Sequence, residues 1–139
     1  MRCLTLWQPW ASLWLTTAKV HETRPWSTNY RGELAVHAGK RPVGWNLPYE
    51  LHCVCVEHLG IDYEKTCPLG AIIGGVQLID VYPIHESSGC GHTDRICGDW
   101  SPGRFLWKRG QFLNLARPIR HAGHQRLWNA PDQILGAPA

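Results

Sequence analysis

Charged residues, methionine and phenylalanine are scarce in this sequence of 139 residues. Asp, Glu, Lys and Arg together make up 18% of the chain, which has one methionine and two phenylalanines, whereas 44% of the residues are hydrophobic. So few charges beside so many apolar residues exclude an intrinsically disordered tail and favour a folded globule. A chain of this length fits one domain, and it is long enough to bury a core without disulfide or metal support.

No hydrophobic run is long enough to cross a membrane. The longest, residues 70–79, falls well short of the roughly 20 residues that span a bilayer. Residues 1–15 contain Gln8 and Pro9 where a secretory signal needs a continuous apolar segment, and no small-residue cleavage site follows. We therefore expect a cytoplasmic protein without membrane contact, in which the six cysteines are reduced thiols and not a disulfide framework.

Phosphate-binding loops, nucleophile elbows and regular metal-ligand pairs are also missing. Cys53 and Cys55 are two residues apart, which on a helix separates them by about 200°. Cys90, His92 and Cys97 crowd one polar segment, but their spacing does not form a Cys-x-x-Cys pair. We therefore expect no metal ion and no cofactor, and zinc bound by these three residues is the alternative.

Tryptophan, in contrast, is abundant. The chain has eight tryptophans, whose flat rings serve both to fill cores and to stack on bases. We expect most of them in the core and Trp10 and Trp26 to be available for stacking. The net charge of +3 and the isoelectric point of about 8.6 permit an anionic partner, although a dedicated duplex-DNA binder is usually more basic.

Short strand patterns dominate the chain. A helix is predicted to begin at Pro9, because proline suits a first helical turn, and a second helix is predicted over residues 49–59. The Gly74-Gly75 pair inside the clearest strand predicts a bulge or bend, and the polar segment 84–102 is expected to be a mobile loop. This pattern favours a small, partly open barrel of α+β type. Strands are predicted at residues 3–7, 19–24, 33–38, 70–82, 105–107, 111–115 and 127–128.

Six blocks of the sequence, in order, carry a family resemblance. They are residues 4–13; 19–24 with Trp26 and 30–32; 34–40; 68–76; 98–104 with Trp107; and 118–119 with Gly123 and 125–128. Together they resemble the ASCH domain family. The resemblance implies an α+β fold, a small partly open PUA-like β-barrel with two or three helices at its rim, formed by residues 1–130 and followed by a short tail, 131–139. It also implies a cleft that receives RNA or a nucleoside.

A cation, a carboxylate and a second cation lie within six residues, as Lys19, Glu22 and Arg24. On a strand Glu22 and Arg24 share one face, and Lys19 lies on the other unless a bulge intervenes. Such a group can bind a phosphate through arginine and accept a hydrogen bond from a base amino group through glutamate. The alternative is a solvated ion pair worth under about 1 kcal/mol.

The same residues resemble the Lys-x-x-Thr-x-Arg pattern of hydrolases in the family, which act on N4-acetylcytidine. Lys19 and Arg24 fit this pattern, but Glu22 stands in the position of the threonine. In this alternative Lys19 and Glu22 are catalytic: Glu22 activates a water molecule and Lys19 stabilises the developing oxyanion. A ribonuclease that uses the same two residues is a further alternative.

Further polar residues are expected around the cleft. For several of them a purely structural role is the alternative to binding a ligand. Arg31 could brace a turn, Asp99 could cap one, and His37 could be a hydrogen-bonded core histidine. Arg104 follows Gly103, where the chain can approach a ligand closely. The predicted nucleic-acid-binding residues are Gln8, Trp10, Lys19, Glu22, Arg24, Trp26, Arg31, His37, Lys40, Asp99, Ser101 and Arg104.

Three functions remain open on the sequence. The leading prediction is a monomeric module that binds single-stranded RNA or a nucleotide, with DNA as a second partner. The second is the hydrolase or ribonuclease described above. The third is a protein-interaction domain that uses exposed tryptophans as anchors.

Overall fold

The computed structural model describes residues 1–85 and 90–131. Residues 86–89 of the predicted polar loop and residues 132–139 of the predicted C-terminal tail lie outside the described residues. None of the helices in the described part is long and apolar enough to cross a membrane.

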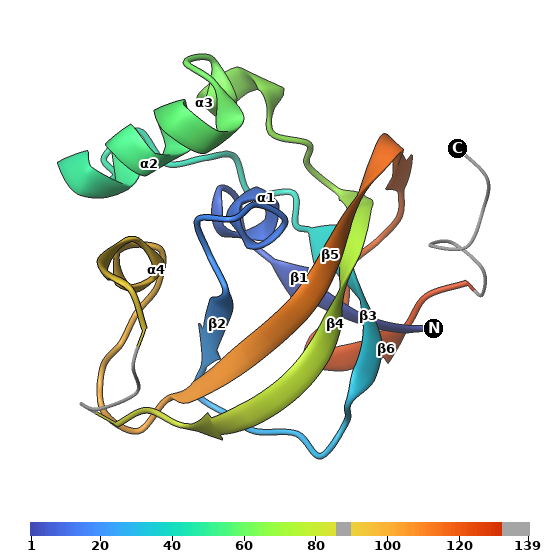
Figure 1. The fold of residues 1–139 in the computed structure, drawn as a ribbon. Helices are drawn as coiled ribbons and strands as arrows, with labels where there is room; N and C mark the ends of the chain where they lie inside the picture. The colour runs from blue at the N-terminus through green and yellow to red at the C-terminus, as the bar shows by residue number, and fades with distance from the viewer. Residues whose placement is uncertain (86–89, 132–139) are drawn as a thin grey trace.

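Six strands form one strongly curved sheet (Figure 1). Its order is β2-β5-β4-β3-β1-β6, and every neighbouring pair is antiparallel except β1 and β3, which are parallel. The two edge strands, β2 and β6, do not pair with each other, so the barrel is partly open and the predicted α+β fold is confirmed. The strands are β1 (Arg2–Leu6), β2 (His21–Arg24), β3 (Gly32–Ala38), β4 (Ala71–Pro83), β5 (Phe105–Arg120) and β6 (Leu127–Asn129).

The curvature arises in the two long central strands. The register shifts at Ile72/Gly74 between β4 and β5, and at Val36/His37 between β3 and β4. Each shift leaves unmatched residues on one strand, which bend that strand and increase its twist. The bend predicted at the glycine pair is therefore confirmed.

β5 is one strand of 16 residues, and the prediction of two separate pieces was wrong. Lys108, Arg109 and Gly110 lie between the two predicted pieces. Arg109, however, is buried within the strand and donates hydrogen bonds to the carbonyl oxygens of Lys19, Thr16 and Gly110. A buried cation is tolerated when its donors find such acceptors, and this arrangement cannot be seen in the local sequence.

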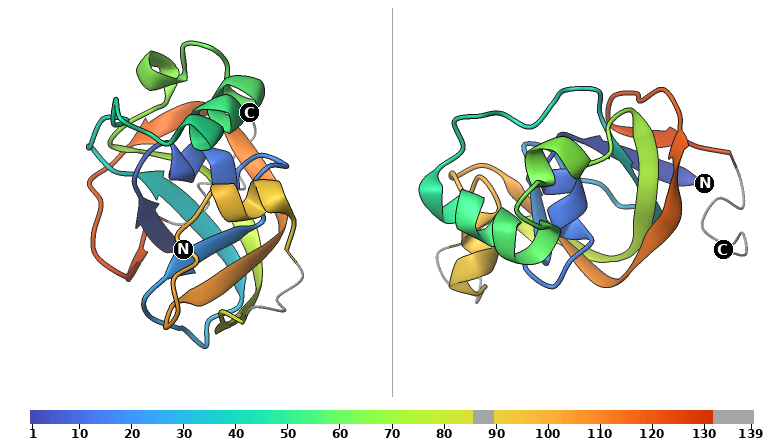
Figure 2. Two further views of the ribbon diagram at one scale, coloured as in Figure 1. Left: turned by 90° about the vertical axis from the view of Figure 1, so that its left-hand side faces the viewer. Right: turned by 90° about the horizontal axis from the view of Figure 1, so that it is seen from above.

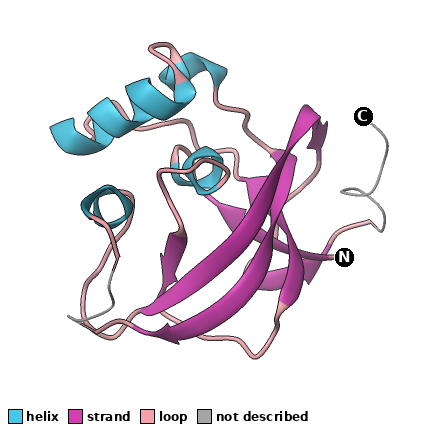
Figure 3. Ribbon diagram, in the orientation of Figure 1, coloured by secondary structure: helices cyan, strands magenta, loops and turns pink. Residues whose placement is uncertain are grey.

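Four short helices gather over one side of the sheet in the described residues, where two or three were expected (Figure 2 and Figure 3). They are α1 (Trp10–Trp14), α2 (Tyr49–Leu59), α3 (Tyr63–Thr66) and α4 (His92–Ile96). α4 lies in the segment predicted as a mobile loop, so that prediction was wrong for residues 92–96. Asp94 explains the difference, because its carboxylate is buried and accepts hydrogen bonds from the backbone N–H groups of Val20 and His21.

The main core fills the inside of the curved sheet and contains Trp14 and Trp107, both fully buried. A second core lies beneath the helices, and a third joins β1 to Trp128. Three of the eight tryptophans are buried, while Trp10 and Trp26 pack partly against a core. All six cysteines are free thiols in the structure.

Candidate functional site

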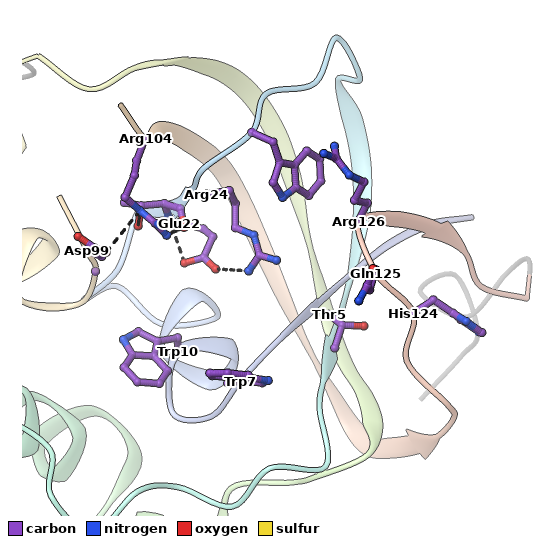
Figure 4. A pocket seen from close by; sticks show the side chains of 13 residues that line it. Thr5, Trp7, Trp10, Glu22, Arg24, Asp99, Arg104, His124, Gln125 and Arg126 are labelled. Carbon is purple, nitrogen blue, oxygen red and sulfur yellow. Dashed lines mark hydrogen bonds and ion pairs between the residues drawn. The ribbon is translucent and has the colours of Figure 1, made fainter. Parts of the chain in front are cut away.

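A pocket of about 590 Å³ lies at the opening between the two edge strands of the sheet (Figure 4). Its volume falls within the range of about 300–1,000 Å³ that is typical of small-molecule sites. The end of β1, the start of α1, β2, the segment before β5 and the segment before β6 all contribute to it. The lining residues are Thr5, Trp7, Trp10, Glu22, Thr23, Arg24, Trp26, Gly98, Asp99, Arg104, His124, Gln125 and Arg126.

A buried ion pair lies beneath the pocket. The Nζ atom of Lys19 is 2.7 Å from Oε1 of Glu22 and 2.9 Å from the carbonyl oxygen of Cys97, and the lysine side chain is fully buried. Only the glutamate lines the pocket, where its Oε2 is 3.4 Å from Nη1 of Arg24. The prediction that Lys19 lies on the opposite face from Glu22 was wrong. β2 begins at His21, so the alternation of a strand does not extend back to Lys19.

Three arginines line the pocket against two carboxylates, so the charges of its lining favour an anionic ligand. Nη2 of Arg104 donates to the carbonyl oxygen of Thr23 at 2.9 Å, and its Nε is 3.7 Å from Oδ2 of Asp99. Nε of Arg24 is buried and has no hydrogen-bond partner among the described residues. A buried donor without a partner is costly, so this atom is a natural point of contact for a ligand or a water molecule.

Asp99 caps a turn, as considered from the sequence, and also contacts an arginine of the pocket. Its Oδ1 accepts a hydrogen bond from the backbone N–H of Ser101 at 3.0 Å, which closes a turn, and its Oδ2 faces Arg104. The hydrogen bonds from Ser101, helped by the charge of Arg104, lower the pKa of Asp99 below its usual value. The carboxylate therefore stays ionised and holds Arg104 at the pocket.

Three tryptophan rings surround the pocket, and they differ in what already covers them. The guanidinium group of Arg126 lies 4.9 Å from the centre of the Trp26 ring, and that of Arg24 lies 6.0 Å from it. Trp7 is 55% exposed and Trp10 is half-buried, and both lie on the side of the pocket facing Glu22 and Arg24 (Figure 4). The guanidinium group of Arg41 lies 4.1 Å from the centre of the Trp7 ring, so a cation lies over Trp7 as well. Trp7, the most exposed of the three rings, and Trp10 are the candidates for stacking on a planar ligand.

Six of the predicted site residues do not line the pocket: Gln8, Lys19, Arg31, His37, Lys40 and Ser101. The Gln8 amide is buried and bonds to Ser12 and to the carbonyl oxygen of Pro68. Arg31 donates to the carbonyl oxygens of Thr28 and Tyr30, so it braces the turn before β3. Lys40 is exposed outside the pocket.

Sequence reasoning missed seven of the lining residues: Thr5, Trp7, Thr23, Gly98, His124, Gln125 and Arg126. All of them except His124 belong to blocks that carry the family resemblance, so a signal was present for these six. Nothing in the sequence, however, shows that the start of the chain and the segment before β6 lie side by side at the open edge of the barrel. Pairing of β1 with β6 brings them together.

His37 is a hydrogen-bonded core histidine. It is buried, its Nε2 lies 2.7 Å from the carbonyl oxygen of His121, and its Nδ1 lies 3.1 Å from Oγ1 of Thr5. The carbonyl can only accept, so Nε2 carries the proton and the neutral ring satisfies both contacts. Burial lowers the pKa of His37 below 6.5; the hydrogen bond to the carbonyl oxygen of His121 opposes this shift, and the charges of the His121 and His124 rings add to it.

We expect the protein to lose stability as the pH falls below 6.5, the unperturbed pKa of histidine. There the unfolded chain takes up a proton on residue 37 before the folded chain does, so acid favours unfolding. Urea unfolding between pH 8 and pH 5 should show a smaller pH dependence for His37→Gln than for the parent protein. The exposed His92 provides the matched control, because His92→Gln should leave the pH dependence unchanged.

The chain resembles proteins of known family. The ASCH domain model matches residues 4–101. Activating signal cointegrator 1 of Mus musculus is 37% identical over 135 residues, and that of Homo sapiens is 28% identical over 134. Each alignment covers 95% of this chain but 22% of the relative, so the chain spans about a fifth of the length of the curated relatives it matches. With the family model covering more than half of the sequence and the expected half-open barrel observed, the chain belongs to the ASCH domain family, whose members are generally RNA-binding.

Proposed function

We propose that the pocket binds a nucleotide of single-stranded RNA, or a modified nucleoside. The observation that carries this proposal is a carboxylate held in place by a buried lysine, in the same pocket as three arginines and two accessible tryptophan rings. A nucleotide offers a planar base, amino and carbonyl groups at the edge of the base, and an anionic phosphate. The pocket has a complementary group for each of these.

Each group of the pocket has a role in this proposal. The rings of Trp7 and Trp10 stack on the base, an interaction worth about 1–3 kcal/mol per base. Glu22 has its Oε1 taken by Lys19 but presents Oε2 to the pocket, where it can accept a hydrogen bond from an amino group. Cytosine offers that amino group and uracil does not. The arginines then bind the phosphate.

The form of the site favours an unpaired strand over a duplex. A pocket that encloses a base requires that the base be unstacked, and sequence-specific RNA recognition mostly targets single-stranded bases for this reason. DNA carries the same cytosine edge, so single-stranded DNA is the second partner to test. Discrimination between the two strands depends on contacts with the 2′-hydroxyl group.

Fluorescence anisotropy with labelled oligocytidine, oligouridine and duplex RNA tests the proposal. We expect salt-sensitive binding, because phosphate contacts release counterions, and a preference for cytidine of about 1 kcal/mol or more. Arg24→Gln should weaken binding about tenfold or more and reduce the slope of log K against log salt by about 0.7. Glu22→Gln should narrow the preference for cytidine over uridine.

Arg117→Gln is the matched control, because Arg117 is an exposed arginine of β5 outside the pocket. Its affinity should equal that of the parent protein. Absence of binding to every oligonucleotide at low salt would overturn the proposal, and so would an equal loss of affinity in the Arg24 and Arg117 variants.

Hydrolysis of a modified nucleoside such as N4-acetylcytidine is the second candidate, favoured by the position of Glu22 in the pocket. A carboxylate there can activate a water molecule. Lys19 is fully buried and does not line the pocket, so it acts on a substrate only through Glu22. This geometry favours binding over catalysis. Chromatography can detect cytidine released from N4-acetylcytidine. If the parent protein releases cytidine and Glu22→Gln does not, hydrolysis becomes the favoured function over binding alone.

A further inference from the structure

A second cluster of polar side chains lies on the opposite face of β2 from Glu22, outside the pocket. His21 is buried, and its Nδ1 is 2.6 Å from Oδ2 of Asp94 in α4 and 3.6 Å from Sγ of Cys90. One potential ligand atom from each of these three residues lies within 4.8 Å of the other two. The hydroxyl group of Tyr82, on β4, is 3.0 Å from Nε2 of the same histidine.

We propose that His21, Cys90 and Asp94 bind a zinc ion that holds α4 and the segment before it against β2. Imidazole nitrogen, thiolate sulfur and carboxylate oxygen are the three donor types that zinc takes in proteins. Among the described residues this trio replaces the combination of Cys90, His92 and Cys97 considered from the sequence. Only Cys90 is common to both, because the fold brings His21 and Asp94 together from positions 73 residues apart.

The spacing of the ligand atoms suits a tetrahedral centre. Zinc lies about 2.3 Å from sulfur and about 2.0–2.1 Å from nitrogen, which places the two ligand atoms about 3.6 Å apart at a tetrahedral angle. The observed separation of Sγ and Nδ1 is 3.6 Å. The histidine–carboxylate contact of 2.6 Å is that of a hydrogen bond, so it opens to about 3.3 Å when zinc takes the place of the proton. A water molecule completes the fourth position.

The exchange of protons for zinc balances. The Cys90 thiol loses its proton to solvent, and the proton on Nδ1 of His21 is replaced by one on Nε2, so the imidazole stays neutral. The Tyr82 hydroxyl accommodates this change, because it donates to Nε2 in one tautomer and accepts from it in the other. One thiolate and one carboxylate then neutralise the charge of the divalent ion, which removes the unbalanced charge of a buried site.

The surroundings of the cluster supply the outer interactions that zinc sites use. Oδ1 of Asp94 accepts hydrogen bonds from the backbone N–H groups of Val20 and His21, at 2.8 and 3.1 Å. These contacts orient the carboxylate and leave Oδ2 directed at the proposed zinc position. The helix held there leads directly into the segment that carries Gly98 and Asp99 to the pocket. Zinc at this position therefore braces one wall of the pocket without lining it.

Titration of the chelator-treated full chain with cobalt(II), and then with zinc, tests the proposal. Cobalt replaces zinc in such sites and gives a thiolate-to-metal absorption band that reports directly on a cysteine ligand. We expect one equivalent of cobalt to bind with this band and zinc to displace it. Zinc should also raise the melting temperature of the parent protein. Cys90→Ser should abolish the band and lower metal affinity at least tenfold.

Cys53→Ser is the matched control, because Cys53 is an exposed cysteine on α2, and this variant should keep the band. If circular dichroism shows that His21→Gln is folded, this variant should also lack the absorption band. Absence of the band in the parent protein would overturn the proposal, as would a band that survives Cys90→Ser. These readouts do not involve nucleic acid, so their failure would leave the proposed nucleotide pocket untouched.

Discussion

Replacing Lys19 with methionine is expected to lower the free energy of unfolding by about 3–5 kcal/mol, the usual cost of removing one partner from a buried ion pair. Methionine fits the volume of the lysine chain but leaves Glu22 without the cation that lies 2.7 Å away. The carbonyl oxygen of Cys97 loses its donor in the same step. Arg24 remains 3.4 Å from Oε2 of Glu22 and the backbone N–H of Thr23 remains 3.2 Å from Oε1, but neither replaces the buried cation, so the effect should exceed that of losing an exposed lysine.

Urea unfolding of a small set of variants measures this effect. Lys65 is an exposed lysine on α3, so Lys65→Met should change stability by less than about 0.5 kcal/mol. The double variant Lys19→Met/Glu22→Gln also removes the negative charge of Glu22, so it should be more stable than Lys19→Met alone. The two substitutions are then not additive, and the double-mutant cycle gives a positive coupling energy. A loss below about 1 kcal/mol for Lys19→Met would show that the pair behaves as an exposed one.

Gly74→Ala is expected to destabilise the protein by about 3 kcal/mol or more, at or above the upper end of the usual cost of overpacking. A Cβ atom at this position would lie 2.1 Å from the carbonyl oxygen of Leu113 on β5 and 2.7 Å from Cδ1 of Leu15. The first neighbour belongs to the backbone of a paired strand, so it cannot rotate away. The two strands would have to separate where the sheet bends.

Gly91→Ala is the control for the loss of a glycine as such, because a Cβ atom there meets nothing within 4 Å and the backbone φ is −67°. It should change stability by no more than about 1 kcal/mol, because alanine restricts the unfolded chain more than glycine does but is a poorer N-cap for α4. Thermal or urea unfolding of both variants makes the comparison. Equal stability of the two would contradict the close approach of β4 and β5 at Gly74.

Much of the local structure could be predicted from the sequence, because it depends on short-range patterns. The β-branched run that forms β4 and the helix at Tyr49–Leu59 are examples. The bend at Gly74 also follows from sequence, since glycine is the residue that permits close approach of two backbones. The resemblance of six ordered blocks to the ASCH family predicted the half-open barrel, and the structure confirms it.

Which side chains meet was decided by the tertiary structure. Lys19, Glu22 and Arg24 are close in sequence, and their proximity could be anticipated, but the burial of Lys19 depends on the Cys97 carbonyl oxygen, 78 residues away. Arg109 lies within a strand because three carbonyl oxygens accept its hydrogen bonds. Asp94 belongs to a helix in a segment whose polar sequence predicted a loop. Hydrogen-bond partners distant in sequence carry no local signal.

The tryptophans also show what the sequence determines and what only the tertiary structure decides. Their number alone indicated a protein that combines a packed interior with rings able to stack, because tryptophan suits both roles. Composition could not assign the roles. Trp14 and Trp107 are buried inside the curved sheet, whereas Trp7 and Trp10 line the pocket. Pairing of β1 with β3 and β6 decides this, because it places the end of β1 at the open edge of the barrel, where a ring can pack on one side and meet a ligand on the other.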